Sequence, residues 1–363
     1  MDLTLRAKTP ISKCNIGPED KVFFGSGGSH TIIVITKDLQ TYKFFPIYFY
    51  EDDILPNIQV SRQNSQAKRE IEIGRVISKY IIDRGISPHY VKFFGYNECE
   101  EISKIFKKCP DYVSYLKSKQ SDKICNEKYK GYPTKMASDE YMVVSMEYCD
   151  YPSTKFIEDI AKKSVEKIEY YLDIFLFQIF YTIMATQKVF PQFTHRDLFL
   201  RNILGIKQKP SSRYYRYTIN KITYDVPVEF FMPKISDYGL TNLNEKLSGT
   251  KLYTKDLLDF FNITYDIYDG GNLGAQSLKS IFKSNETKLK FLDKYFKTFF
   301  NPKKISELKA NKSVFMNWNW DHIRDDKFRS YIEFVKPEKI MKTYFKKKFK
   351  FDPEHQIEQE FYI

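Results

Sequence analysis

Three polar side chains near the middle of the sequence have the types and the spacing that phosphoryl transfer requires. Asp197 ends a His-Arg-Asp sequence, Asn202 lies five positions later, and Asp237 begins an Asp-Tyr-Gly sequence. A carboxylate can orient an attacking hydroxyl and accept its proton, while a carboxamide and a second carboxylate supply oxygen ligands for Mg²⁺ on a triphosphate. The sequence therefore predicts phosphoryl transfer from Mg-ATP, with Asp197 as the base, Asn202 and Asp237 as metal ligands, and Arg196 fixing the loop.

This chemistry also needs elements that hold the triphosphate, and the upstream sequence supplies them. Two apolar runs, 22–24 and 31–35, are predicted strands joined by a glycine-rich turn, whose N–H groups could approach phosphate oxygens without an intervening Cβ. Lys43 lies in the next apolar run, 40–47, where a lysine is more often an outward-facing strand residue. The downstream motifs favour a phosphate-binding lysine instead. The turn residues assigned to nucleotide binding are Gly25, Ser26, Gly27 and Gly28.

A helical pattern that begins at Ala67 and runs through Ile82 supplies an acidic partner for Lys43. Glu70 and Glu72 are two residues apart, which separates their side chains by about 200° around a helix. Only one of them can face the lysine, and we favour Glu70.

In this order the motifs resemble the eukaryotic-type protein kinase family over most of the chain, and especially the divergent serine/threonine kinases of large DNA viruses. The resemblance implies an α+β, bilobal fold with a small β-rich N-terminal lobe that contains one long helix, and a larger, mostly helical C-terminal lobe. It places Met146 at the gatekeeper position and assigns adenine binding to the main chain of Glu147 and Cys149. It also implies ATP and Mg²⁺ as cofactors and a protein substrate phosphorylated on serine or threonine.

A single kinase-like domain is expected to occupy residues 1–363, with the N-terminal lobe at 15–148 and the C-terminal lobe at 149–363. The lysine-rich interval at about 100–140 is predicted to be an insertion in the first lobe. Asp237 follows Asp197 by 40 positions (237 − 197), about twice the interval usual in the family, so a hairpin insertion is predicted at about 208–232. Residues 172–184 are apolar on nearly all sides and should form a buried central helix.

Several positions depart from the family pattern. His30 stands where a third loop glycine is expected, and Phe199 stands where serine/threonine kinases usually carry lysine. Arg201, four residues after Asp197, resembles the tyrosine-kinase loop. We still favour a serine or threonine acceptor, because divergent viral kinases often lose that lysine. No Ala-Pro-Glu sequence precedes the helix near Asp256, the residue proposed to brace the catalytic loop.

Composition and charge restrict the setting in which the chain works. The net charge of +12 is compatible with nucleic acid or anionic surfaces, but we do not favour them. The densest basic run, 342–350, is interpreted as a solvated helix face with buried phenylalanines. Five scattered cysteines argue against a disulfide framework, and no apolar segment approaches the roughly 20 residues that span a bilayer. A soluble intracellular protein is expected, in the host cytoplasm or the virion if the chain is viral.

Two alternatives to a protein kinase stay open on the sequence alone. A small-molecule phosphotransferase of the aminoglycoside or choline kinase type shares the Asp-plus-Asn loop and the later metal-binding Asp. The complete His-Arg-Asp sequence and Gly239 favour the protein kinase. A non-catalytic pseudokinase or basic binding module is disfavoured because every metal-binding group is retained, although His30 keeps that alternative open.

Overall fold

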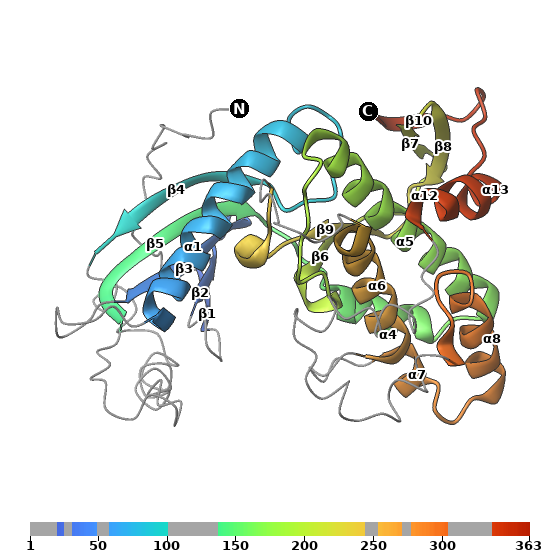
Figure 1. Ribbon diagram of the computed structural model, residues 1–363, viewed down its shortest axis with the longest axis horizontal. Helices are drawn as coiled ribbons and strands as arrows, with labels where there is room; N and C mark the ends of the chain where they lie inside the picture. The colour runs from blue at the N-terminus through green and yellow to red at the C-terminus, as the bar shows by residue number, and fades with distance from the viewer. Residues whose placement is uncertain are drawn as a thin grey trace. The chain divides into compact units, whose positions relative to one another are not determined.

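The computed structural model in Figure 1 describes residues 20–24, 31–48, 58–100, 137–243, 253–270, 277–303 and 336–363. It is a mixed α+β structure in which strands predominate early in the chain and helices later. The described residues form two compact units. Unit 1 contains residues of the ranges Met1–Lys79, Val91–Tyr148 and Tyr238–Leu240, and unit 2 contains residues of Tyr80–Tyr90, Cys149–Asp237 and Thr241–Ile363.

Unit 1 is built on an antiparallel sheet of five strands. Their order is β1-β2-β3-β5-β4, with the bounds Lys21–Phe24, Ile32–Ile35, Gln40–Tyr48, Ala137–Glu147 and Phe93–Cys99. β-branched and aromatic residues predominate in β1 and β2, as expected for a pleated surface that is buried on one side. Lys43 in β3 lies opposite Ile33 of β2 and Val144 of β5, so the position predicted to hold phosphate is in the middle of the sheet.

One long helix, α1 (Ile58–Ile77), packs against β3 and β4 of this sheet (Figure 1). The approach to β4 is close at Gly74, where an added Cβ would come within 2.4 Å of the Phe93 ring. One turn later, Ser78 Oγ donates to the Gly74 carbonyl and accepts the Phe93 amide N–H. A glycine and a serine therefore fix α1 to β4, while the π-helical segment η1 (Ser78–Ile82) continues the chain.

The core of unit 2 is α5 (Val165–Val189), whose first turn is capped by the Ser164 side chain accepting from Lys167 N. It contacts α4 (Ser153–Ala161), α8 (Glu286–Phe296) and strands β7 (Tyr214–Ile219) and β9 (Phe231–Ile235). By length and composition α5 could cross a membrane, but 83% of its apolar window is buried inside the protein. Its apolar surface is therefore covered by the rest of the unit, as in a core helix.

Helices after residue 250 are shorter than the sequence pattern suggests. The run 278–300 has a continuous helical pattern in the sequence, yet it forms two helices, α7 (Leu278–Ile281) and α8, because Asn285 accepts the Lys288 N–H and begins a new helix. The other helical segments of this region are α6 (Tyr253–Asp269), α12 (Pro337–Ile340), η6 (Met341–Phe345) and α13 (Lys346–Lys348). Phe345 and Phe349 are buried, while Lys342, Lys346 and Lys347 are exposed, as interpreted from the basic run.

Two small sheets complete unit 2. β6 (Ile203–Lys207) pairs with β9 (Phe231–Ile235), and the intervening residues form a hairpin of β7 (Tyr214–Ile219) and β8 (Ile222–Pro227). Asn220 and Lys221, at the tip, have φ values of 52° and 62°, as a two-residue type I′ turn requires. The C-terminal strand β10 (Ile357–Tyr362), which the sequence did not predict, adds to β7 in parallel.

Asp225 ties this hairpin to the C-terminal segment of the chain. It is fully buried, forms two bonds with Arg216 at 2.8 and 3.0 Å, and accepts from Asp352 N and His355 Nδ1. Burial would raise the pKa of Asp225, but these hydrogen bonds lower it below its usual range. The carboxylate is therefore ionised and fully engaged.

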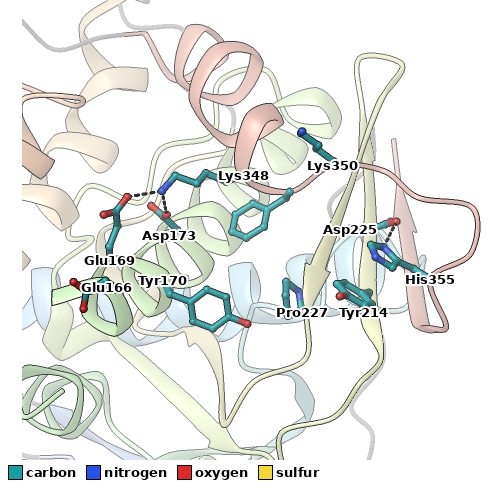
Figure 2. Close-up of a pocket in the computed structure, with 11 residues that line it drawn as sticks. Glu166, Glu169, Tyr170, Asp173, Tyr214, Asp225, Pro227, Lys348, Lys350 and His355 are labelled. Atoms are coloured by element: carbon teal, nitrogen blue, oxygen red, sulfur yellow. Dashed lines mark hydrogen bonds and ion pairs between the residues drawn. The ribbon is translucent and has the colours of Figure 1, made fainter. Parts of the chain in front are cut away.

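A cavity of about 500 Å³ lies beside this cluster, between the start of α5, the hairpin and the C-terminal segment. Figure 2 shows the residues that line it. Its charged side chains face one another: Lys348 bonds Glu169 and lies 3.1 Å from Asp173, and His355 meets Asp225 (Figure 2). No residue of the predicted catalytic loop is among the residues that line it.

Replacing Asp225 with alanine is expected to lower the free energy of unfolding by about 3–5 kcal/mol, because Arg216 would be left largely buried without its counter-ion. Urea unfolding followed by circular dichroism measures this change. Glu360→Ala is the control, since Glu360 is 55% exposed and 3.6 Å from Arg216, and it should cost less than about 1 kcal/mol. Equal losses in the two variants would contradict the role given to Asp225.

The contacts place two short segments outside the boundaries expected from the sequence. Residues Tyr80–Tyr90 cluster with unit 2, where His89 contacts the Pro233 carbonyl and Tyr217 Oη. Burial lowers the pKa of His89 to about 3, so this imidazole is neutral. Tyr238–Leu240 instead cluster with unit 1, where the Tyr238 ring packs on Phe93.

The cysteines also depart from expectation at one position. Cys99, at the end of β4, is disulfide-bonded, whereas the scattered cysteines had predicted no disulfide framework. Cys149 is not disulfide-bonded. The predicted insertion lies mostly outside the described residues, since 101–136 are not among them.

Candidate active site

The loop that carries Asp197 is held at its start by a buried carboxylate from α6. Asp259 is 1% exposed, and its two oxygens accept the backbone N–H groups of His195 at 2.6 Å and Arg196 at 2.9 Å. Arg196 has a φ of 68°, the left-handed region that costs a non-glycine residue roughly 1 kcal/mol. Burial raises the pKa of Asp259, while His195 and the donated hydrogen bonds lower it. Two hydrogen bonds therefore stabilise the strained turn that presents Asp197.

Further bonds fix the loop on both sides of Asp197. His195 is fully buried, and its Nε2 lies 2.9 Å from the Ser236 carbonyl. A second carboxylate of α6, Asp266, accepts the Leu200 N–H at 2.8 Å. The loop then enters η3 (Leu200–Asn202) and β6, and the Ser236 N–H donates to the Asn202 carbonyl at 2.8 Å.

Asp197 and Asn202 form one hydrogen-bonded unit. Asn202 Nδ2 donates to the Asp197 carboxylate oxygen Oδ2 at 2.8 Å and to its main-chain oxygen at 2.7 Å. Both hydrogens of the Asn202 amide are directed at Asp197. The amide oxygen, Asn202 Oδ1, is therefore the atom of Asn202 that is suited to act as a metal ligand. The other Asp197 oxygen, Oδ1, accepts Arg201 Nη2 at 2.6 Å.

The charge of Asp197 is set by opposing effects. Burial raises its pKa, the Arg201 charge and the Asn202 hydrogen bond lower it, and the neighbouring Asp237 charge raises it, so that the pKa lies above the ordinary value. The Ser236 N–H, one residue before Asp237, donates to the Asn202 carbonyl, so the chain that leads to Asp237 is bonded to this loop.

The third predicted group, Asp237, ends the segment that returns from β9. Its φ is 63°, which directs the chain sharply after Ser236 and is tolerated by aspartate better than by most residues. Asn202 and Asp237 both offer oxygen ligands, the kind that Mg²⁺ binds. The donor set therefore fits a magnesium ion held by one or two side chains and by the oxygens of a bound phosphate.

In unit 1, the structure places Lys43 and Glu70 in direct contact. Lys43 Nζ lies 2.6 Å from Glu70 Oε1, with side chains 17% and 6% exposed, whereas Glu72 is exposed. The Lys43 ammonium also lies 4.7 Å from the centre of the Phe45 ring. A lysine held in this way presents a fixed positive charge at the surface of the sheet, suited to a phosphate.

Only some of the other residues predicted to lie around the nucleotide are among the described residues. Met146 and Glu147 end β5, where Met146 is buried and the Glu147 N–H donates to the Lys92 carbonyl at 2.8 Å. Cys149 follows two residues later and is partly exposed. Gly25, Ser26, Gly27 and Gly28 lie outside the described residues, as does His30.

The side chain of Asp256, proposed to brace the catalytic loop, lies outside the described residues. Asp259, one helical turn later on α6, makes the two bonds to the loop. Asp266 was not identified at all. The available signal was Asp259 itself, a carboxylate inside the apolar run 257–261, where burial without a partner would be costly.

No protein-family model matches the chain. A protein of Acanthamoeba polyphaga mimivirus, named as a putative serine/threonine-protein kinase, is 26% identical over 291 residues, which cover 70% of this chain and 71% of that protein.

A second mimivirus protein with the same kind of name is 22% identical over 241 residues, covering 64% of this chain. The match spans about half of that protein's own length, 49%. The chain is therefore a relative of proteins from a large DNA virus that are named as serine/threonine protein kinases, as the resemblance of its motifs predicted.

Proposed function

We propose that this chain is a protein kinase that transfers the γ-phosphate of Mg-ATP to a serine or threonine hydroxyl of a protein. The observation that carries the proposal is the Asp197–Asn202 unit on a loop held by Asp259, with the residue before Asp237 bonded to Asn202. This arrangement offers one carboxylate for a hydroxyl and two side-chain oxygens for a metal. The mimivirus relatives support the same activity.

Asp197 is proposed to accept a hydrogen bond from the acceptor hydroxyl and to take its proton late in the transfer. Asn202 and Asp237 would hold Mg²⁺, which when bound neutralises charge on the phosphate oxygens. Asn202 has a second task, because its amide orients the Asp197 carboxylate. Arg196 supports the loop through its backbone N–H and its left-handed conformation.

Lys43 is proposed to bind the α- and β-phosphates, and Glu70 to fix the direction of its side chain. The main chain at Glu147 and Cys149 is proposed to bind the adenine, and the turn at 25–28 to cover the phosphates. Each of these roles uses hydrogen bonds and charge, so the protein would act by positioning rather than by covalent chemistry.

Lys43→Met should reduce phosphate transfer about 100-fold, because it removes the cation while keeping an unbranched side chain of similar length. Initial rates with labelled ATP measure the loss. Lys68→Met on α1 is the matched control, since Lys68 is exposed, and it should keep the wild-type rate. Unchanged kinetics in Lys43→Met would show that a residue other than Lys43 binds the nucleotide phosphates.

The function itself is tested by incubating the purified chain with labelled ATP, Mg²⁺ and an array of degenerate peptides whose acceptor is serine, threonine or tyrosine. We expect label in serine or threonine peptides only when Mg²⁺ is present. Label in tyrosine peptides would show that the acceptor residue is tyrosine instead. Label in small alcohols but not in peptides would indicate a small-molecule phosphotransferase, and no transfer to any acceptor would indicate a non-catalytic protein.

A further inference from the structure

Arg201 is the one cation among the described residues that bonds the carboxylate of Asp197. Its Nη2 is 2.6 Å from Asp197 Oδ1, and its guanidinium carbon lies 4.6 Å from the centre of the Phe199 ring. The Leu200 N–H bond to Asp266 fixes the backbone immediately before it. The guanidinium is therefore held in place by an ion pair, a ring face and a fixed main chain.

The ion pair with Asp197 uses only part of the hydrogen-bonding capacity of this guanidinium. Arginine carries five N–H donors, and one of them is bonded to Asp197 Oδ1. The Arg201 side chain is 39% exposed, against 20% for Asp197. In the part of the chain that the structure describes, Arg201 has no second acidic partner within ion-pair distance, so an anion from outside can reach it.

The distance between Arg201 and an acceptor residue follows from hydrogen-bond lengths. An acceptor hydroxyl must come within about 3 Å of Asp197, and Arg201 is already 2.6 Å from the same carboxylate. The guanidinium would then lie within roughly 6 Å of the acceptor oxygen. Since each residue of an extended peptide advances about 3.3–3.6 Å, the side chains flanking the acceptor are within its reach.

We propose that Arg201 is a specificity-determining residue that selects substrates with a carboxylate or phosphate on a residue next to the acceptor. The guanidinium fork can bind such a group through two parallel hydrogen bonds, while a lysine or arginine in the same place would be repelled. This inference rests on the proposed kinase function and adds the chemical class of its substrate. The same contact would draw Arg201 toward the peptide and leave Asp197 Oδ1 to the hydroxyl.

The test uses the full chain and a set of serine peptides that differ at one flanking position at a time. Each position carries alanine, aspartate, phosphoserine or arginine, and kcat/KM is measured for phosphate transfer. For the best position, wild type should prefer the anionic peptide over the alanine peptide about tenfold, largely through a lower KM. Arg201→Gln should reduce this ratio to less than about twofold.

Arg213→Gln is the matched control, because it removes the same charge from a side chain of unit 2 that is 55% exposed. It should keep the tenfold ratio, whereas Arg201→Lys, which retains charge without the fork, should give an intermediate ratio. If Arg201→Gln and Arg213→Gln show the same preference for the anionic peptide over the alanine peptide, the proposal is overturned. The selection would then reflect the net charge of the protein and not Arg201 itself.

A binding measurement separates this inference from the proposed function. Fluorescence anisotropy with peptides whose acceptor is replaced by alanine should show tighter binding of the phosphoserine peptide to wild type than to Arg201→Gln. Phosphate transfer without anion preference would reject the inference and leave the kinase function standing. Anion-selective binding lost in Arg201→Gln, without transfer to any peptide, would reject the kinase function and keep Arg201 as the anion-binding residue.

Discussion

Asp197→Asn should reduce the rate of phosphate transfer about 1000-fold while the protein stays folded. General-base catalysis contributes roughly 10²–10⁴-fold, and an amide cannot accept the proton that the carboxylate takes. The substitution keeps the size of the side chain and an oxygen that can accept a hydrogen bond from Arg201. Single-turnover incorporation of labelled phosphate into a peptide measures the loss without interference from product release.

Two controls accompany this variant. Asp38→Asn makes the same chemical change at an exposed position and should keep the wild-type rate. Nucleotide affinity in the presence of Mg²⁺ should be within about twofold of wild type in Asp197→Asn, since the proposed metal ligands are intact. Wild-type turnover in the purified variant would show that Asp197 is not the base.

The local part of the site could be predicted from sequence because its information is local. Asp197 and Asn202 are five residues apart, and their side chains meet through bonds within a single loop. Helix geometry indicated that only one of Glu70 and Glu72 can face Lys43, and the structure places the favoured residue, Glu70, against it. At the level of fold, strands early in the chain and helices later are confirmed.

Long-range partners could not be read from the sequence in the same way. Asp259 bonds a backbone N–H 64 positions earlier, and no local pattern shows which carboxylate of α6 faces the loop. β10 was missed because Glu358, Gln359 and Glu360 are exposed polar residues that do not alternate with apolar ones. Its place is set by pairing with β7, which only tertiary structure brings alongside.

The helix break in the predicted stretch 278–300 was missed for a different reason. Apolar residues continue through Phe282 and resume in α8, so the periodicity hides the interruption. Asn285 is the signal, because an asparagine side chain that caps a new helix competes with continuation of the old one. Capping residues inside an apolar pattern therefore carry information that periodicity alone does not.

Asp237 should be as important as Asp197, but its loss should have a different signature. Removing its carboxylate takes away a proposed Mg²⁺ ligand, so phosphate transfer should fall about 1000-fold and nucleotide affinity in Mg²⁺ about tenfold. In Asp197→Asn, by contrast, affinity should be kept. Titrating the transfer rate and nucleotide binding against Mg²⁺ concentration measures both effects, and a wild-type Mg²⁺ dependence would remove Asp237 from the metal site.

The backbone at Asp237 determines which substitution gives a clean answer. With φ at 63°, alanine would be strained by roughly 1–2 kcal/mol, and loss of activity in Asp237→Ala could then reflect a displaced loop. Asparagine tolerates the left-handed region, so Asp237→Asn removes the charge while keeping the backbone geometry. If Asp237→Asn loses both transfer and Mg²⁺-dependent nucleotide affinity while its thermal unfolding matches wild type, the charge is required. If only Asp237→Ala is inactive, the residue serves to shape the turn between Ser236 and Tyr238.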